Sequence, residues 1–327
     1  MPDRRRSLTG EELSRLAQAI DPAARAIESE PLLGGLDWGT YGIEIERPGG
    51  RAWYVVRRFD GEGDRPAVSA RRLWTVLNAL RGIDLPVPRP VLVDEGALIG
   101  VPVLVMTRCE GAVRPPPAAP SAWIDAYAGA LAAIHGTDVA RVAGLPRCRG
   151  RDEELERILT RQPEDDLRAT WEDVAGSLRR HSAAVGNVGS VLRHGDVWFG
   201  NTLWRGDRVT GLLDWGEACV GDPRADLGYS RLDVHLILGA EAAEAFRRAY
   251  ERRRGAMPDL AYFDLLATVP GLAWLPDWVD GYHEVGLSEL SLSLARARLL
   301  AFVSDAASRL ASQGQTWATD PPKLVGN

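Results

Sequence analysis

The sequence predicts an α+β protein in which a small β-rich lobe precedes a larger, mainly helical lobe. The chain has 327 residues, which exceeds one typical domain. Strand-like alternation of apolar and polar residues is prominent in its first third, and helical spacing of apolar residues dominates the remainder. The proline-rich segment 114–120 separates the two patterns. We therefore expect an N-lobe at residues 1–106, a hinge and linker at 107–120, and a helical C-lobe at 121–327.

Two local signals define the N-lobe elements. Thr9 and Glu12 have the spacing of a capping box at the start of a helix. The turn residues at 48–50 separate two runs of alternating apolar residues and predict a β-hairpin. The expected elements are a helix at 9–20, strands at 41–45 and 52–59, a helix at 69–81, and strands at 90–96 and 101–107.

The C-lobe elements follow from helical periodicity and caps. Ser121 is expected to cap a helix that reaches His135, which we interpret as a hydrogen-bonded core histidine. The charged run 151–180 is expected to be helical, and residues 209–215 to form a short strand. Asp222–Pro223 has the residue types of an N-cap and a first helical position. Further helices are expected beyond it.

Composition excludes several classes of protein. The formal net charge of −6 argues against general nucleic-acid binding and is compatible with a cationic small substrate. We expect a cytoplasmic protein, because we find no signal-peptide core and no apolar run long enough to span a membrane. Cys109, Cys148 and Cys219 are scattered without a CxxC pair, so we expect neither a disulfide nor a zinc site. Because Lys323 is the only lysine, any cation that grips phosphates must be an arginine.

The segment RHGDVWFGN, residues 193–201, carries the strongest chemical signal. A lone HGD is more often a turn, but here an asparagine follows the aspartate by five residues. In phosphoryl-transfer catalytic loops, an aspartate such as Asp196 accepts the hydroxyl proton and an asparagine such as Asn201 holds magnesium. Asp214 follows a short apolar run, where such sites place a second metal-binding aspartate. A divalent cation on these oxygen atoms would offset the charge of the transferred group.

Together, HGDVWFGNTLW and VTGLLDWGEACVGDPRADLG resemble the aminoglycoside phosphotransferase family, small-molecule kinases with a protein-kinase-like fold. The family pattern is HGD-x4-N, then a strand with D-[WF], then GDP-x-x-D-L, and the chain matches every position. Looser matches extend the resemblance over about residues 30–310. It implies a protein-kinase-like two-lobed fold. It also implies transfer of the γ-phosphoryl group of ATP, or of GTP, to a hydroxyl of a small molecule with Mg²⁺.

The resemblance also implies roles for individual residues. Asp196 resembles the catalytic base, and Asn201 and Asp214 resemble the magnesium ligands. Arg57 stands where the family places the cation that grips the α- and β-phosphates. The other nucleotide-binding residues that the resemblance implies are Gly34 and Gly35 in a nucleotide loop, Met106, Thr107 and Cys109 at the hinge, and Leu203 and Leu213 beneath the base.

One departure from the kinase pattern concerns the partner of Arg57. Kinases usually pair the strand cation with a glutamate on the following helix. Residues 69–81 contain no acid, and Leu73 stands at the expected position. Glu62 is an alternative partner for Arg57.

A second departure is Gly195, which replaces the arginine that reads a phosphorylated activation loop in protein kinases. The interval from Asp214 to Asp222 is too short for such a loop, so we predict no activation-loop switch. His194 and Asp226 are expected to be structural, with Asp226 accepting hydrogen bonds from backbone amides of the catalytic loop.

The acceptor site has weaker signals. Each candidate contact has a plain alternative as a packing or solvated residue. The candidates are Trp198, Glu217, Trp274, Asp277 and Trp278, the last three within the aromatic and acidic segment 274–284. Two alternatives to an antibiotic kinase stay open: a nucleotide-binding pseudokinase without turnover, and a metabolic kinase for a sugar or an amino alcohol.

Overall fold

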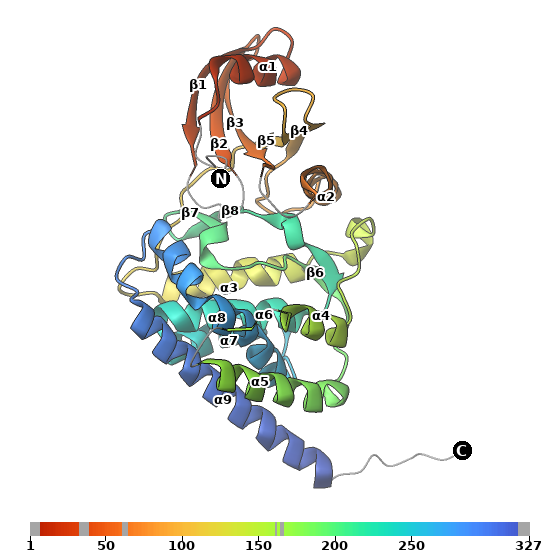
Figure 1. Cartoon of the computed structure of the whole chain (residues 1–327), viewed down its shortest axis with the longest axis vertical. Helices are drawn as coiled ribbons and strands as arrows, with labels where there is room; N and C mark the ends of the chain where they lie inside the picture. Colours follow the sequence, from red (N-terminus) through yellow and green to blue (C-terminus); the bar gives the residue numbers. More distant parts are fainter. Residues whose placement is uncertain (1–6, 33–38, 61–64, 161, 164–166, 320–327) are drawn as a thin grey trace, which may run out of the picture.

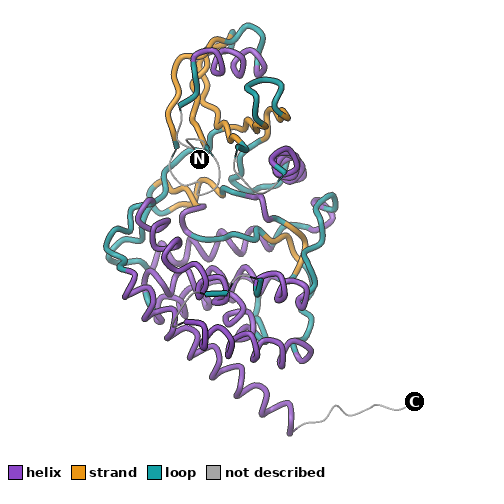
Figure 2. Tube along the Cα trace, viewed as in Figure 1, coloured by secondary structure: helices purple, strands orange, loops and turns teal. Residues whose placement is uncertain are grey.

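The computed structural model describes residues 7–32, 39–60, 65–160, 162–163 and 167–319. Its largest sheet forms a small lobe at one end, and helices make up most of the larger lobe (Figure 1). Figure 2 shows the same division, with the strands of the sheet gathered above the helices. The predicted two-lobed, kinase-like fold class is confirmed. Among the described residues, no helix has the length and apolarity needed to cross a membrane.

The N-lobe is a five-stranded antiparallel sheet with a helix on each face. The strands pair in the order β1-β2-β3-β5-β4. Their bounds are β1 (Arg25–Pro31), β2 (Thr40–Arg47), β3 (Gly50–Arg58), β4 (Pro90–Glu95) and β5 (Pro102–Thr107). β1 was not predicted, because this edge strand is half-exposed and lacks apolar alternation.

The alternation along β3 decides which side chains face the C-lobe. Tyr54 and Val56 pack in the core beneath α1 (Gly10–Ile20), whose predicted capping box is present. Val55 and Arg57 point to the opposite face of the sheet, because successive strand residues alternate in direction. On that face α2 (Pro66–Ala79) packs against β4 and β5.

The C-lobe is built around α6 (Pro223–Leu238), which is buried along most of its length and packs against three other helices. Asp222 caps α6 and Pro223 is its first residue, as predicted. At the start of α3 the N-cap is Pro120, and not Ser121 as expected. The remaining helices are α3 (Ser121–His135), α4 (Arg151–Ile158), α5 (Arg168–His181), α7 (Ala240–Arg254), α8 (Leu260–Glu284) and α9 (Leu292–Thr319).

Two short strand pairs lie where the lobes meet. β6 (Val191–Arg193) pairs with β9 (Cys219–Gly221), and β7 (Thr202–Arg205) forms a hairpin with β8 (Arg208–Leu212). The catalytic loop predicted from the sequence connects β6 to β7. The short pairs therefore fix both ends of this loop.

The expectation that no disulfide forms is wrong, because Cys148 and Cys219 are bonded. The two cysteines are 71 residues apart in sequence, but their Cα atoms lie 5.1 Å apart. The amide of Cys148 donates to the carbonyl of Val220, and the amide of Val220 donates to the carbonyl of Pro146. This strand-like pairing beside β9 brings the two cysteines together, and no local spacing rule signals it.

Candidate active site

The catalytic loop is anchored on Asp226, one turn into α6. One carboxylate oxygen of Asp226 accepts from Nε of Arg193 at 2.9 Å. The other accepts from the amides of His194 at 2.7 Å and Gly195 at 3.4 Å. Burial raises the pKa of Asp226, but Arg193 and His135 outweigh it and hold the pKa well below its usual range. Asp226 thus fixes the backbone just before Asp196, and its predicted structural role is confirmed.

His135 at the end of α3 and His194 in the catalytic loop both make structural hydrogen bonds, as predicted. His135 is buried, with hydrogen bonds to Tyr250 at 2.6 Å and Asp226 at 3.4 Å. His194 donates through Nε2 to the carbonyl of Leu213 at 2.7 Å, which ties the catalytic loop to the segment after β8. Burial lowers the pKa of both imidazoles, so their neutral forms are favoured.

A second anchor is Asp233, two turns further along α6. This buried carboxylate accepts from the amide of Phe199 at 3.0 Å and from the hydroxyls of Tyr127 and Tyr282 at 3.2 and 2.8 Å. Burial raises its pKa to about 7. Ser230 adds a bond from its hydroxyl to the carbonyl of Val197 at 2.9 Å.

Sequence reasoning missed Asp233, Tyr229 and Ser230, although a signal was present. Together with Asp226 they recur at intervals of three and four residues along the helix. Such spacing places them on one face of α6, which is the face that meets the catalytic loop.

Asp196 is held by two donors. Nδ2 of Asn201 donates to one carboxylate oxygen at 2.9 Å, and the hydroxyl of Tyr229 donates to the other at 3.2 Å. Burial and then the negative charge of Asp214 raise the pKa of Asp196 to about 7. A carboxylate with a raised pKa is a stronger proton acceptor than an ordinary aspartate.

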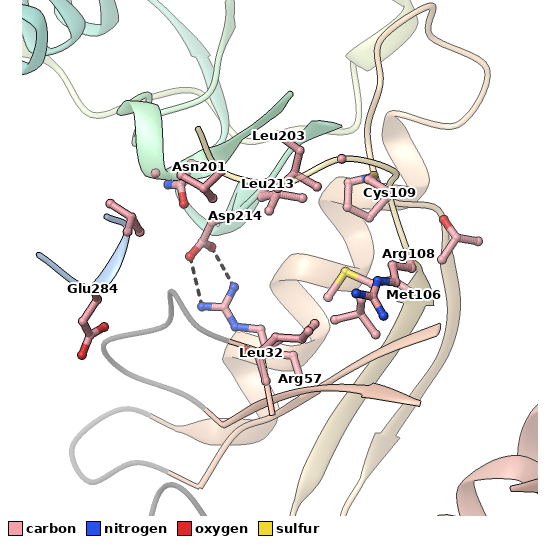
Figure 3. A pocket seen from close by; sticks show the side chains of 18 residues that line it. Leu32, Arg57, Met106, Arg108, Cys109, Asn201, Leu203, Leu213, Asp214 and Glu284 are labelled. Carbon is pink, nitrogen blue, oxygen red and sulfur yellow. Dashed lines mark hydrogen bonds and ion pairs between the residues drawn. The ribbon is translucent and has the colours of Figure 1, made fainter. Parts of the chain in front are cut away.

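Asp214 stands at a strained turn between β8 and the short helix Trp215–Glu217. Its φ angle of 56° lies in the left-handed region, which is uncommon outside glycine. Its carboxylate accepts from the two Nη atoms of Arg57 at 2.8 and 3.2 Å, and Figure 3 shows this pair spanning the cavity. Burial raises the pKa of Asp214, but the charge and hydrogen bonds of Arg57 outweigh it and lower the pKa.

The missing helix acid is explained by this pair. Leu73 on α2 is buried in the core, and no described acid of α2 reaches Arg57. Arg57 takes Asp214 as its partner instead. Glu62, the alternative proposed from the sequence, lies outside the described residues.

Gly195 also has a structural cause. Its φ angle is +87°, and a Cβ atom at this position would lie 2.7 Å from the Cβ atom of Glu217. An arginine side chain has no room here, so the catalytic loop packs directly against the segment after Asp214.

A cavity of about 380 Å³ opens between the lobes beside these residues. Its volume lies within the range of small-ligand pockets. Figure 3 shows Leu203 and Leu213 on the C-lobe wall and Met106 on the N-lobe wall, with Asn201 and Asp214 towards one end. Thr107 and Cys109 line it at the hinge, where burial raises the pKa of the Cys109 thiol to about 11. Gly34 and Gly35 lie outside the described residues.

The comparisons with known proteins decide the family. Residues 30–263 match the model of the phosphotransferase enzyme family. The chain belongs to this family. The predicted membership of a phosphotransferase family is confirmed.

Individual relatives of this chain are distant in sequence. It is 28% identical over 226 residues to the Arabidopsis thaliana protein "Probable acyl-CoA dehydrogenase IBR3", covering 62% of this chain and 27% of that one. It is 29% identical over 178 residues to viomycin phosphotransferase of Streptomyces vinaceus, covering 46% and 58%. The chain therefore spans less than two thirds of either relative.

Among solved structures, the chain resembles a mutant of aminoglycoside phosphotransferase APH(4)-Ia in a ternary complex with ADP and hygromycin B. The TM-score is 0.63 at 17% identity, and the match covers 90% of this chain and 98% of that one. At 17% identity, this similarity shows the fold alone.

The substrate candidates predicted from the sequence lie in separate places. Trp198 lies against Gly200, where a Cβ atom would meet its ring at 2.3 Å, and packs edge-on against Tyr282. Trp278 packs edge-on against Tyr229, the residue that holds Asp196. Trp198 is thus part of the catalytic loop, and Trp278 contacts the tyrosine that holds Asp196.

The other candidates lie elsewhere. Trp274 is half-buried at a non-helical position inside α8, Asp277 is exposed, and Glu217 lines a different cavity beside Arg72. Within segment 274–284, Glu284 lines the cavity between the lobes, on the side of Asp214 (Figure 3). The substrate roles of all five candidates stay predictions.

Proposed function

We propose that this protein transfers the γ-phosphoryl group of ATP, with GTP as the alternative donor, to a hydroxyl of a small molecule. The observation that carries this proposal is one convergence. Asn201, Asp214 and Arg57 line one end of a mainly apolar cavity, and Asp196 is hydrogen-bonded to Asn201 beside it. A base, two oxygen ligands and a cation are the groups that phosphoryl transfer requires.

Asp196 acts as the base in this proposal. The acceptor hydroxyl gives its proton to the Asp196 carboxylate while its oxygen forms a bond to the γ-phosphorus. The bond from that phosphorus to the bridging oxygen breaks, and ADP leaves. Tyr229 and Asn201 hold the carboxylate in place, so little reorganisation is needed when the acceptor arrives.

Asn201 and Asp214 fit a magnesium ion. Asn201 donates through Nδ2 to Asp196, and its Oδ1 makes no hydrogen bond with the described residues. Asp214 adds carboxylate oxygens, and such hard oxygen atoms, together with phosphate oxygens, are what Mg²⁺ prefers. When bound, the ion would neutralise charge on the phosphates.

Arg57 then changes partner. Its ion pair with Asp214 spans the cavity, and its Nε is buried without a partner among the described residues. We infer that the Arg57 guanidinium binds nucleotide phosphates when Asp214 binds the metal ion instead. The planar guanidinium suits two phosphate oxygens at once.

The acceptor class rests on the relatives. Viomycin phosphotransferase and the hygromycin B complex of APH(4)-Ia favour a hydroxylated antibiotic or a related metabolite. The half-buried rings of Trp198 and Trp278 beside the base suit an acceptor with an apolar or flat face.

A screen tests the proposal. Purified protein is mixed with magnesium and ATP or GTP, and nucleotide consumption and thermal stability are measured with aminoglycosides, macrolides, peptide antibiotics, sugars and amino alcohols. We expect acceptor-dependent consumption that disappears when magnesium is chelated. Nucleotide binding without consumption in any arm would favour the pseudokinase and contradict the proposal.

A further inference from the structure

A second cavity, of about 740 Å³, lies behind the catalytic loop and shares no lining residue with the cavity between the lobes. We call it the arginine cavity. It is bounded by α2, segment 146–150, α4, the β6–β9 pair and the catalytic loop. Five arginines and three glutamates line it, so its lining is net positive although the whole chain is negative. The arginines are Arg72, Arg147, Arg149, Arg157 and Arg193.

Two of these arginines are neutralised locally. Arg157 forms a two-pronged ion pair with Glu154, and Arg149 lies 3.7 Å from Glu153. Both acids belong to α4. Arg72 and Arg193 each also face one acid, Glu217 and Asp226, so Arg147 is the lining arginine without an acidic partner among the described residues.

The remaining three arginines have donors to offer. Arg147 is exposed and makes no side-chain hydrogen bond or ion pair with the described residues. Arg193 donates through Nε to Asp226, and its two Nη groups make no hydrogen bond with the described residues. Arg72 faces Glu217 only at 3.5 Å, and its Nε is buried without a partner in the described part of the chain.

We propose that the arginine cavity binds the phosphate group of a small molecule, at a site separate from the nucleotide. Phosphate oxygens accept several N–H donors at once, and guanidinium groups match them two by two. Glu217, which lines the cavity, faces Arg72, and Asp226, which lies outside its lining, pairs with Arg193. A phosphate dianion would thus accept hydrogen bonds from arginine N–H groups that have no partner among the described residues.

The wall that carries Arg147 is fixed before any ligand arrives. The Cys148–Cys219 disulfide and the backbone bonds between Val220 and residues 146 and 148 hold this segment against β9. A fixed backbone at Arg147 leaves only the side chain to be ordered on binding. This built wall distinguishes the cavity from a patch of mobile surface arginines.

The site contacts the catalytic machinery. Gly195, which precedes Asp196, and Glu217, which packs against Gly195, both line the arginine cavity. A bound phosphate that draws Arg72 away from Glu217 changes the contacts of the segment after Asp214. Occupancy of the cavity is therefore expected to alter turnover as well as stability.

Calorimetric titration with inorganic pyrophosphate, without magnesium and at constant ionic strength, tests the site. We expect wild type to bind it and the Arg72→Ala/Arg147→Ala double variant to lose about ten-fold or more in affinity, because charge-assisted hydrogen bonds are lost. Arg208→Ala is the matched control, since Arg208 is also exposed and unpaired among the described residues but lies outside the cavity. Unchanged thermal unfolding of each variant shows that folding is intact.

A third variant separates the arginine cavity from the nucleotide site. Arg57→Ala is expected to keep pyrophosphate binding, because Arg57 does not line the arginine cavity. Absence of binding in wild type, equal affinity in the double variant, or loss in Arg57→Ala alone would each overturn the proposal. None of these outcomes depends on whether the protein turns ATP over.

Two further kinetic measurements show whether the bound phosphate belongs to the acceptor or to a separate effector. If it belongs to the acceptor, the single variant Arg147→Ala, which keeps the Arg72–Glu217 contact, raises KM for phosphorylated acceptors and leaves KM for unphosphorylated ones unchanged. If it belongs to a separate effector, pyrophosphate changes kcat without competing with the acceptor, and the double variant abolishes this change. Pyrophosphate binding at the cavity with neither effect overturns the link to the active site.

Discussion

The two sides of the active site are held in different ways. On the C-lobe side, α6 fixes the catalytic loop through Asp226, Ser230 and Asp233, all of which are buried. On the N-lobe side, Arg57 reaches the C-lobe through one ion pair with Asp214. In the proposed mechanism, the fold therefore presets the base, whereas the cation on β3 exchanges a carboxylate for phosphates when nucleotide binds.

The largest expected effect concerns the preset side. Asp196→Asn removes the proton acceptor but keeps the shape of the side chain. Turnover should fall by about a thousand-fold, within the usual range for loss of a general base, while the affinity for ATP stays within about three-fold of wild type. Steady-state kinetics and nucleotide titration measure the two quantities. Near-normal turnover would show that another group accepts the proton.

Asp214→Ala tests the adjustable side. Without the carboxylate, one metal ligand is lost and Arg57 is released. The increase in nucleotide affinity that magnesium gives to wild type should shrink to about nothing, whereas metal-free affinity should stay equal or rise. Titration of ATP with and without magnesium checks both. An unchanged magnesium effect would remove Asp214 from the metal site.

The two buried aspartates of α6 provide a matched pair for stability. In Asp226→Asn, an amide N–H must face either Arg193 or the loop amides, and the arginine loses its counter-charge. We expect a loss of about 3 kcal/mol in the free energy of unfolding. Asp233→Asn should lose only about 1 kcal/mol, because the hydroxyl of Tyr282 can rotate to accept from the new amide. Denaturant unfolding measures both, and equal losses would contradict this account of the anchors.

The smallest expected effect is a dependence of stability on pH. Burial raises the pKa of Asp233 to about 7 in the folded protein, above its unfolded value. Its contribution is therefore full at low pH and is lost as pH rises through 7. The pKa of Asp226 is lowered, so its contribution is present above its unfolded pKa and is lost as pH falls.

Asp233→Asn isolates the first of these contributions. The unfolding free energy of wild type minus that of Asp233→Asn should decrease by about 1 kcal/mol between pH 6 and 8. Denaturant unfolding at each pH measures the difference. A difference that is constant over this range would place the ionised form of Asp233 in the folded protein throughout.

The parts of the fold that sequence reasoning found are those with local signals. Periodicity revealed the paired lobes, and fixed spacing revealed the catalytic loop and Asp214. The edge strand β1 was missed because an exposed edge needs no apolar alternation. The disulfide was missed because tertiary topology alone brings Cys148 to Cys219.

The partner of Arg57 was missed for a similar reason. The kinase pattern directed attention to the next helix, but the strained turn at Asp214 offers a carboxylate from the other lobe. A contact between residues of different lobes has no fixed interval in the sequence that could predict it. The polar face of α6, by contrast, was visible in the spacing of Asp226, Tyr229 and Asp233 and could have been predicted.

Phosphorus NMR of the reaction products tests the central claim most directly. Wild-type protein is incubated with magnesium, ATP and the acceptor found by the screen, beside Asp196→Asn under the same conditions. The account predicts a new phosphate-ester signal that grows with ADP in wild type and is absent from Asp196→Asn, which still binds nucleotide. Inorganic phosphate as the only product, or an ester formed equally by both proteins, would contradict it.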